Sequence, residues 1–261
     1  MGTAVRTFNR AEAATSIMKA VETRQHEMMA LAPKGYDAEY FLSSLRLYFA
    51  TNPKLLECYP VSVATAMLRV AQTGLELGVS CDILPFEAKG SGSPRAQFNP
   101  RTSGLVELML KAGVRSVNYN VVREGDEFDY CLGAPPSVKH KPALKDRGLV
   151  IAAWSAVETK LGSFQITVMT RDEIDGIRRQ YSKSWWQKHG SVIPLEDIPW
   201  YAAKTVLRQG AKYAPKNPRL AAALRFDADE IEDAEVETIE VGVVPTAAPS
   251  AEDVSGEAPT E

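Results

Sequence analysis

The spacing of the apolar residues changes twice along the chain, and this change limits the possible folds more than any other feature of the sequence. In residues 10–75, apolar side chains recur every three or four positions, which is the spacing of amphipathic helices. Between residues 117 and 168 they alternate with polar ones, as in "VNYNVV" and "SFQITV", which is the spacing of strands with one buried face. The helical spacing returns in residues 171–182 and 200–213. The sequence therefore predicts a run of strands with helices before and after it.

The predicted elements begin and end at recognisable signals. Asp37 fits the N-cap of a helix over residues 37–51, and Pro199 fits the first turn of the last helix. Further helices are expected over residues 10–31, over residues 61–75 and in "GLVELMLKAG". Strands are expected at "CDILPF", "VNYNVV", "EFDYCL", "GLVIAAWSAV" and "SFQITV". Short turns such as "REGD" join neighbouring strands, which favours an antiparallel meander.

The formal net charge of −3 conceals a division of the chain into a basic body and an acidic tail. Arg225 is the last basic residue, and 12 acidic residues follow it. The preceding part holds 30 basic residues and 21 acidic ones, a surplus of nine cations. A basic body with an acidic tail is typical of proteins that bind polyanions, although both charges would also serve solubility alone.

Three regions are expected from these patterns. Residues 1–35 form an N-terminal helical segment that suits packing on the body or contact with a neighbouring subunit. Residues 36–227 form the core. Residues 228–261 lack aromatic side chains and are acidic, so we expect them to be disordered, because they can bury too little apolar surface to offset the entropy of ordering.

Several classes of protein have no signature in this sequence. The three cysteines have no C-x-x-C spacing, which disfavours a zinc site or a disulfide framework and favours reduced thiols in a cytoplasm. A P-loop motif is absent, which disfavours a nucleotide-driven motor. No apolar run approaches the roughly 18 residues of a membrane span, and the N-terminus lacks the apolar segment of a signal peptide. We therefore expect a cytoplasmic protein that needs no cofactor and no metal.

Basic residues with interleaved aromatic ones are the strongest functional signal. In "KTVLRQGAKY", Lys204, Arg208 and Lys212 are four residues apart and form one stripe on a helix, while Leu207 and Ala211 lie on an adjoining face that suits packing. The preceding "RRQYSKSWWQKH" adds further cations and aromatics. Cations neutralise phosphates and aromatic rings stack on exposed bases, so the pattern favours nucleic-acid binding. The alternative is a solvated helix face beside tryptophans that belong to the core.

A second hypothesis is a metal-dependent nuclease. One large class of nucleases uses an Asp followed at a distance by Glu-x-Lys, in which the acids hold a divalent cation and the Lys orients the attacking water. Here Asp126 and Asp129 precede Glu158 and Lys160 in this order. The alternative is a charged turn between two strands, since so short a motif often arises by chance.

The chain resembles the RecT family of phage-type single-strand annealing proteins from about residue 38 to residue 225. The resemblance is carried by "VVREGDEFDYCLG", "VKHKP", "GLVIAAWSAVETKLG" and "PWYAAKTVLRQGAKYAPK", in this order and spacing. The segment "AQFNPRTSGLVELMLKAG" is similar as well, but family members often carry a basic residue where this chain has Ser103, with Arg101 two residues earlier.

The resemblance implies an α+β body with a small antiparallel sheet, which assembles into rings or helical filaments and anneals complementary strands without ATP. It also implies work beside a phage exonuclease or a host single-strand-binding protein, in a bacterial or phage-infected cell. Phe98 and Trp200 are candidates for stacking on bases or for the wall of a groove, with packing as the alternative. The candidate DNA-contacting residues are Lys204, Arg208, Lys212, Arg101, Lys139, Lys141, Arg178, Lys183, Phe98 and Trp200. A third hypothesis is a plain single-strand DNA-binding protein without annealing activity.

Overall fold

The structure is a computed structural model that describes residues 9–35, 37–86, 93–181 and 193–226. Its helices are α1 (Arg10–Thr23), α2 (Gln25–Leu31), α3 (Ala38–Thr51), the 3₁₀ helix η1 (Pro53–Glu57), α4 (Pro60–Thr73), α5 (Thr102–Lys111), α6 (Arg171–Tyr181), α8 (Pro199–Ala211) and α9 (Pro218–Phe226). Its strands are β1 (Cys81–Phe86), β2 (Arg95–Pro100), β3 (Val114–Arg123), β4 (Glu127–Cys131), β5 (Ser137–Lys141), β6 (Val150–Thr159) and β7 (Phe164–Thr170). Helices combine with antiparallel sheets, so the predicted α+β class is confirmed.

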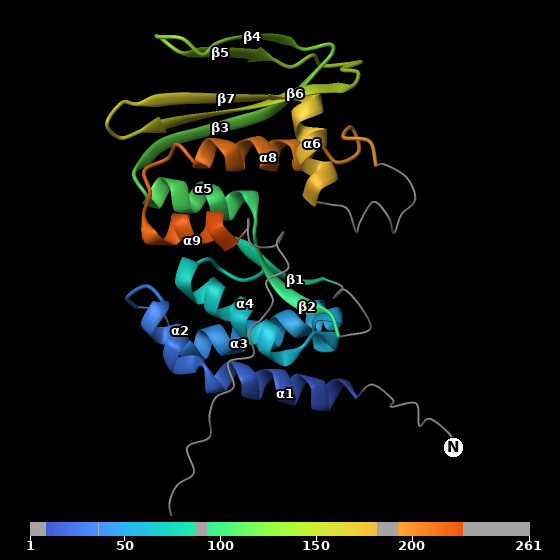
Figure 1. Cartoon of the computed structure of the whole chain (residues 1–261), viewed down its shortest axis with the longest axis vertical. Helices are drawn as coiled ribbons and strands as arrows, with labels where there is room; N and C mark the ends of the chain where they lie inside the picture. Colours follow the sequence, from blue (N-terminus) through green and yellow to red (C-terminus); the bar gives the residue numbers. More distant parts are fainter. Residues whose placement is uncertain (1–8, 36, 87–92, 182–192, 227–261) are drawn as a thin grey trace, which may run out of the picture.

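The elements are stacked in layers along the long axis of the molecule (Figure 1). The β4–β5 hairpin lies at one end, above the sheet formed by β3, β6 and β7. Helix α8 lies beneath this sheet, and α5 and α9 lie beneath α8. The β1–β2 hairpin and helices α1 to α4 form the other end. Helix α8 therefore occupies the middle of the stack.

The N-terminal helices begin and end where side chains or glycine satisfy the backbone. Asp37 caps α3 by accepting hydrogen bonds from two backbone amides, as its position predicted. Gly74 ends α4 with φ at 68°, in the left-handed region that glycine adopts without strain. The helix predicted over residues 10–31 is interrupted at Arg24, which divides it into α1 and α2. Ile17 and Val21 of α1 are buried in the main core, so the described part of this segment packs on the body.

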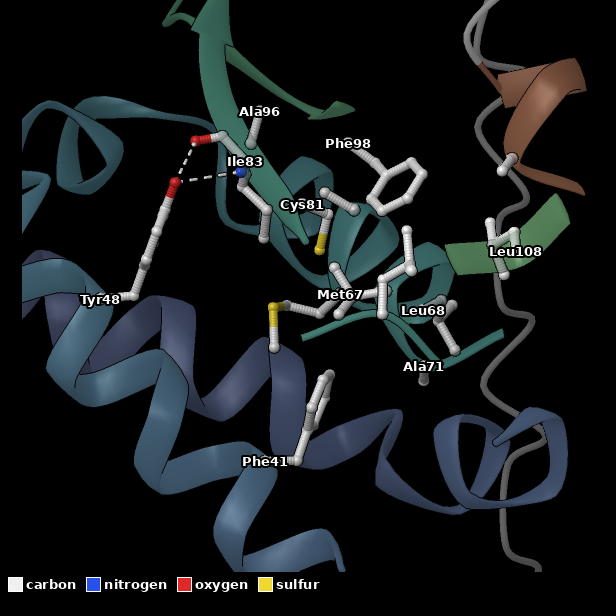
Figure 2. Packing of buried hydrophobic residues seen from close by; sticks show 14 of the residues in the cluster. Phe41, Tyr48, Met67, Leu68, Ala71, Cys81, Ile83, Ala96, Phe98 and Leu108 are labelled. Carbon is white, nitrogen blue, oxygen red and sulfur yellow. Dashed lines mark hydrogen bonds between the residues drawn. The ribbon is translucent and has the colours of Figure 1, made fainter. Parts of the chain in front are cut away.

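The main core lies between helix α4 and the β1–β2 hairpin. Met67 and Ala71 of α4 are fully buried, and Phe98 of β2 and Leu108 of α5 pack in the same cluster (Figure 2). A second cluster joins Val121 and Ala153 of the three-stranded sheet to helices α6 and α8.

The predicted single meander is wrong in its pairing. Strand β3 pairs with β6 and not with the next strand along the chain, and β7 pairs with the other edge of β6. Strand β4 instead pairs with β5 in a separate two-stranded sheet. The short strand β5, "SVKHK", was not predicted, because its exposed lysines show no apolar alternation. Once β4 has β5 as its partner, β3 is left to pair with the apolar strand β6.

Two contacts seat α8 against the sheet. Gly210 lies so close to β6 that a Cβ atom there would come within 2.4 Å of the Ser155 Oγ. The Ser155 hydroxyl in turn donates a hydrogen bond to the Val206 carbonyl.

Ahead of the helix, Glu196 accepts hydrogen bonds from Arg171 and from the Val150 amide. Burial of Glu196 opposes its ionisation, but these hydrogen bonds prevail and lower its pKa to about 2.

Candidate nucleic-acid interface

The basic surplus lies in one part of the chain. Residues 1–92 hold nine basic and nine acidic residues, whereas residues 93–226 hold 21 basic and 12 acidic ones. The second part supplies strand β2, the three-stranded sheet, the β4–β5 hairpin and helices α5, α6, α8 and α9. The N-terminal helical body is therefore electrically balanced, and an attraction for polyanions must come from the layers around α8.

Helix α8 carries the predicted basic stripe on the part of its surface that packing leaves open. Ala202 and Val206 are buried in the second cluster, and Leu207 and Ala211 are buried in the main core. Lys204 and Arg208 are half-buried, and Lys212, at the C-cap, is exposed. The adjoining packing face that the sequence predicted at Leu207 and Ala211 is confirmed.

The stripe continues onto strand β2, which was not predicted from the sequence. The Lys204 ammonium donates a hydrogen bond of 2.7 Å to the Asn99 Oδ1. Along β2 the buried and open positions alternate, so that Arg95, Gln97 and Asn99 share the outward face. The polar–apolar alternation of "RAQFNP" was the signal that could have revealed this strand. We call Lys204, Arg208, Lys212, Arg95, Gln97 and Asn99 the polar track.

Arg101 lies at the junction of β2 and α5, but its charge is matched by an acid. Its Nε and Nη2 atoms each donate a 2.6 Å hydrogen bond to Asp82, one to each carboxylate oxygen. Asp82 is the cross-strand neighbour of Asn99, which binds Lys204. The structure thus brings Arg101 next to the α8 stripe, with one carboxylate between them.

Lys139 and Lys141 lie on a different surface. Lys141 forms an ion pair of 2.9 Å with Glu127, and Lys139 lies opposite Asp129 in the hairpin register. The outer face of the hairpin therefore balances its own charges. Because Trp154 contacts the hairpin while its neighbour Ser155 contacts α8, the sheet separates these lysines from the α8 stripe.

The other four candidate DNA-contacting residues are Phe98, Arg178, Trp200 and Lys183. Phe98 is fully buried, which agrees with the packing alternative and leaves no ring face open to a base. Arg178 is 2% exposed, donates a hydrogen bond to the Ile193 carbonyl and lies over the Tyr201 ring, so it joins α6 to the segment before α8. Trp200, at the start of α8, is 62% exposed. Lys183 lies outside the described residues.

The acids of the nuclease hypothesis are not brought together. Asp126 lies beside the beginning of β6, and Glu158 lies near its end, eight residues from Val150, which corresponds to roughly 26 Å along a strand. Glu158 instead contacts Arg115 and Ser116. Among the described residues, no group of three His, Cys, Asp or Glu side chains could hold a metal ion.

Asp126 anchors the β4–β5 hairpin to the sheet. Its carboxylate accepts two hydrogen bonds from Arg147, one from the His140 Nε2 and one each from the Arg123 and Ala143 amides. The hydrogen bonds from Arg147 are the main cause that holds the Asp126 pKa well below its usual range. The other nitrogen of His140, Nδ1, accepts from the Trp154 indole, so the ring is held as the Nε2–H tautomer.

A basic line on a central helix of an α+β body is the arrangement expected of a protein that binds an extended polyanion. No described helix has the length and apolar character needed to cross a membrane.

Comparison with known proteins identifies the class. The RecT family model matches residues 41–241, which is more than half of the chain, and the chain belongs to the RecT family. RecT family proteins act in DNA recombination as annealing proteins rather than as classical enzymes.

The comparison with curated proteins agrees. Protein RecT of Escherichia coli (strain K12) is 27% identical to this chain over 215 residues, which cover 79% of this chain and 77% of that protein.

Proposed function

We propose that this chain binds single-stranded DNA along the polar track and anneals complementary strands without ATP. The observation that most supports the proposal is the position of Lys204, Arg208 and Lys212 on the open side of a helix that packs on both neighbouring layers. Membership of the RecT family supports the same activity. The absence of a P-loop motif from the sequence agrees with independence from ATP.

The proposed mechanism depends on which part of the DNA the polar track would bind. Cations contact phosphates whatever the sequence, and each contact releases a counterion. A strand held by its backbone leaves its base edges available to a second strand. Base pairing then supplies the specificity of annealing, and the protein supplies alignment and charge neutralisation. The annealed product is a duplex, which then leaves the polar track or remains bound to it.

The length of the stripe supports assembly of several subunits. Lys204 and Lys212 are eight residues apart, which is about 12 Å along a helix. With phosphates about 3.4 Å apart along one strand of a duplex, one stripe spans on the order of four of them. A stable register between long strands needs more pairs than that, so we infer that subunits join into a ring or a helical filament. A phage exonuclease or a host single-strand-binding protein would act beside this assembly.

An annealing assay tests the proposal directly. Two complementary oligonucleotides, one with a fluorophore and one with a quencher, are mixed with and without the protein and without ATP. We expect the protein to accelerate quenching. A plain single-strand binder would instead slow pairing, because it competes with the second strand, and that result would contradict the annealing step.

The nuclease alternative is separated by a second measurement. Wild-type protein and Glu158→Ala are incubated with labelled DNA and Mg²⁺ or Mn²⁺. We expect no metal-dependent cut products from the wild type and unchanged annealing by the variant. Cutting that disappears in Glu158→Ala would restore the nuclease hypothesis.

A further inference from the structure

Arg101 is a cation of the candidate interface, and it already forms an ion pair with Asp82 of the same chain. Its guanidinium uses two donors on the two oxygens of Asp82, in the forked geometry that guanidinium groups also use on phosphates. The Arg101 side chain is 44% exposed, so a ligand from solvent can reach it. Asp82 thus presents to Arg101 two oxygens in the place where a DNA phosphate would present its own.

The Asp82 carboxylate is held in this position independently of Arg101. The Tyr48 hydroxyl donates a hydrogen bond of 3.0 Å to the Asp82 Oδ1, and it accepts one from the Ile83 amide. Figure 2 shows the Tyr48 hydroxyl beside the backbone of Ile83. Asp82 is also 17% exposed. If Arg101 turned to another anion, Asp82 would keep a hydrogen-bond donor and some contact with water, so the exchange would leave no buried, unsatisfied charge.

The position of Asp82 connects it to the polar track. Asp82 pairs with Asn99 across the β1–β2 hairpin, and Asn99 accepts the hydrogen bond from Lys204. Neighbouring residues of an antiparallel pair have Cα atoms about 5 Å apart, so the carboxylate lies within one side-chain length of the stripe. A strand of DNA that reached Lys204 would therefore meet the carboxylate and Arg101 together.

We propose that Asp82 is a built-in competitor of DNA for Arg101, which lowers the affinity of the interface for single strands. This inference rests on the proposed DNA-binding function and adds a regulation of the same surface. In the free protein, Arg101 is bound to Asp82. When a strand lies on the track, one phosphate takes donors of Arg101 from Asp82, and the repulsion between phosphate and carboxylate opposes the exchange. Binding is then weak enough for a strand to be released or moved until a complementary strand is found.

Asp82→Asn tests the competition. The amide keeps an oxygen for the Tyr48 hydroxyl but removes the charge. We expect binding to a fluorescein-labelled oligo-dT at low salt to tighten by roughly fivefold, the effect of removing one like charge near a phosphate. Because Arg101 gains a full phosphate contact, the slope of log affinity against log salt should steepen by about 0.7. Thermal unfolding confirms that the variant is folded.

Two further variants test whether the effect of Asp82→Asn depends on Arg101 and on the position of the lost charge. In an Arg101→Gln background, Asp82→Asn should bring no gain, because the contested cation is gone. Glu27→Gln is the matched control: Glu27 forms a comparable pair with Arg24, and its loss changes the net charge equally, but it lies on the balanced N-terminal body. We expect Glu27→Gln to leave binding unchanged.

Three results would overturn the competition. Equal binding by wild type and Asp82→Asn, with both folded, would show that Asp82 does not contest Arg101. Weaker binding by Asp82→Asn would show that Asp82 positions Arg101 for DNA. A gain that persists in the Arg101→Gln background would show general repulsion by Asp82. No binding of oligo-dT by the wild type at low salt would instead contradict the proposed function itself.

Discussion

Two cations of the candidate interface, Lys204 and Arg101, donate hydrogen bonds to acceptors of different charge. Lys204 donates a hydrogen bond to Asn99, which is a neutral acceptor. Arg101 is bound by the charged Asp82, which cancels most of the field that a distant phosphate would meet. A distant phosphate therefore meets less net charge at Arg101 and Asp82 than it would at an arginine without an acid beside it.

We predict that Lys204→Glu weakens single-strand binding without unfolding the protein. The substitution removes one phosphate contact and adds a repulsive charge, so affinity should fall by about tenfold or more, and the salt slope should fall by about 0.7. Fluorescence anisotropy over a salt series measures both quantities. Arg208→Glu should act in the same direction. Lys54→Glu on η1 is the control, because Lys54 is exposed on the balanced N-terminal body. Normal binding by both folded stripe variants would make the stripe a solvated face.

Asp126 fits a catalytic sequence pattern, but its contacts in the structure stabilise the fold. Five donors surround its carboxylate, and its side chain is fully buried, so no lone pair is left open to a metal. The short Asp and Glu-x-Lys pattern could not convey this, because His140 and Arg147 approach from positions 14 and 21 residues further along the chain.

We predict that Asp126→Asn destabilises the protein by about 3–5 kcal/mol, the usual cost of breaking a buried ion pair from one side. Urea unfolding at pH 7 measures the loss, and Asp129→Asn, on the exposed face of β4, should cost little. The folded-state pKa of Asp126 lies below its unfolded value of about 3.9. Its contribution is therefore present above pH 4 and is lost as the pH falls further, so the difference between wild type and variant should shrink in acid. A difference that did not change between pH 7 and pH 3 would contradict this assignment.

At the scale of secondary-structure elements, the close approach of α8 to β6 positions the basic stripe. Gly210 has no side chain, and a Cβ atom there would meet the Ser155 Oγ and come within 3.4 Å of its Cβ. The Ser155 hydroxyl already holds the Val206 carbonyl of the same helix. A displacement of α8 would therefore move the stripe relative to Asn99, to which Lys204 is bound.

We predict that Gly210→Ala lowers the free energy of unfolding by about 1–3 kcal/mol, because overpacking against the sheet outweighs the better helix propensity of Ala. Gly176→Ala in α6 is the matched control. A Cβ atom at Gly176 meets nothing within 4 Å, so this variant should gain about 0.5–1 kcal/mol. The Gly210 variant should also bind oligo-dT less tightly, and unchanged stability and binding together would mean that α8 tolerates the displacement.

Long periodic segments were predictable from the sequence, and pairing between distant segments was not. Helices α3 and α4 and the packed face of α8 follow from local spacing and caps, which the sequence displays directly. The break at Arg24 is not marked by Gly, Pro or a change in apolar spacing, and the pairing of β3 with β6 joins segments far apart in the chain. The meeting of Lys204 with Asn99, 105 residues away, is of the same kind. The stripe itself could therefore be predicted, but its continuation onto β2 could not.

At the scale of the whole molecule, the division of charge matches a division of layers. Residues 1–92, which supply helices α1 to α4, are balanced in charge, whereas residues 93–226, which supply the layers around α8, hold a surplus of nine basic residues in the sequence. Because one stripe spans few phosphates, the proposed function implies that a single subunit would bind a long strand weakly and that several subunits in register would bind it far better.

We predict that the protein forms larger assemblies with DNA than without it. Sedimentation velocity is measured for the protein alone, with one oligonucleotide, and after the complementary strand is added. The largest species should appear in the last case, because annealed DNA presents more phosphates to adjoining subunits. Negative-stain images of the same samples should show rings or filaments. A protein that stays monomeric in all three samples would contradict assembly.

We also predict that the acidic tail restrains DNA binding. Residues 228–261, which lie outside the described residues, carry acids and no bases, and they follow the last helix of the basic body. A tethered segment reaches an effective concentration on the order of millimolar at a nearby surface, so its carboxylates would compete with phosphates for the same cations. Each exposed contact is weak and is screened by salt. Deleting residues 228–261 should therefore tighten oligo-dT binding at low salt, and the gain should diminish as salt rises. Replacing the tail acids with Gln and Asn at full length separates charge from length, and it should reproduce the gain. Equal affinities of full-length and truncated protein at every salt concentration would exclude self-competition and leave recruitment of a basic partner or solubility as the role of the tail.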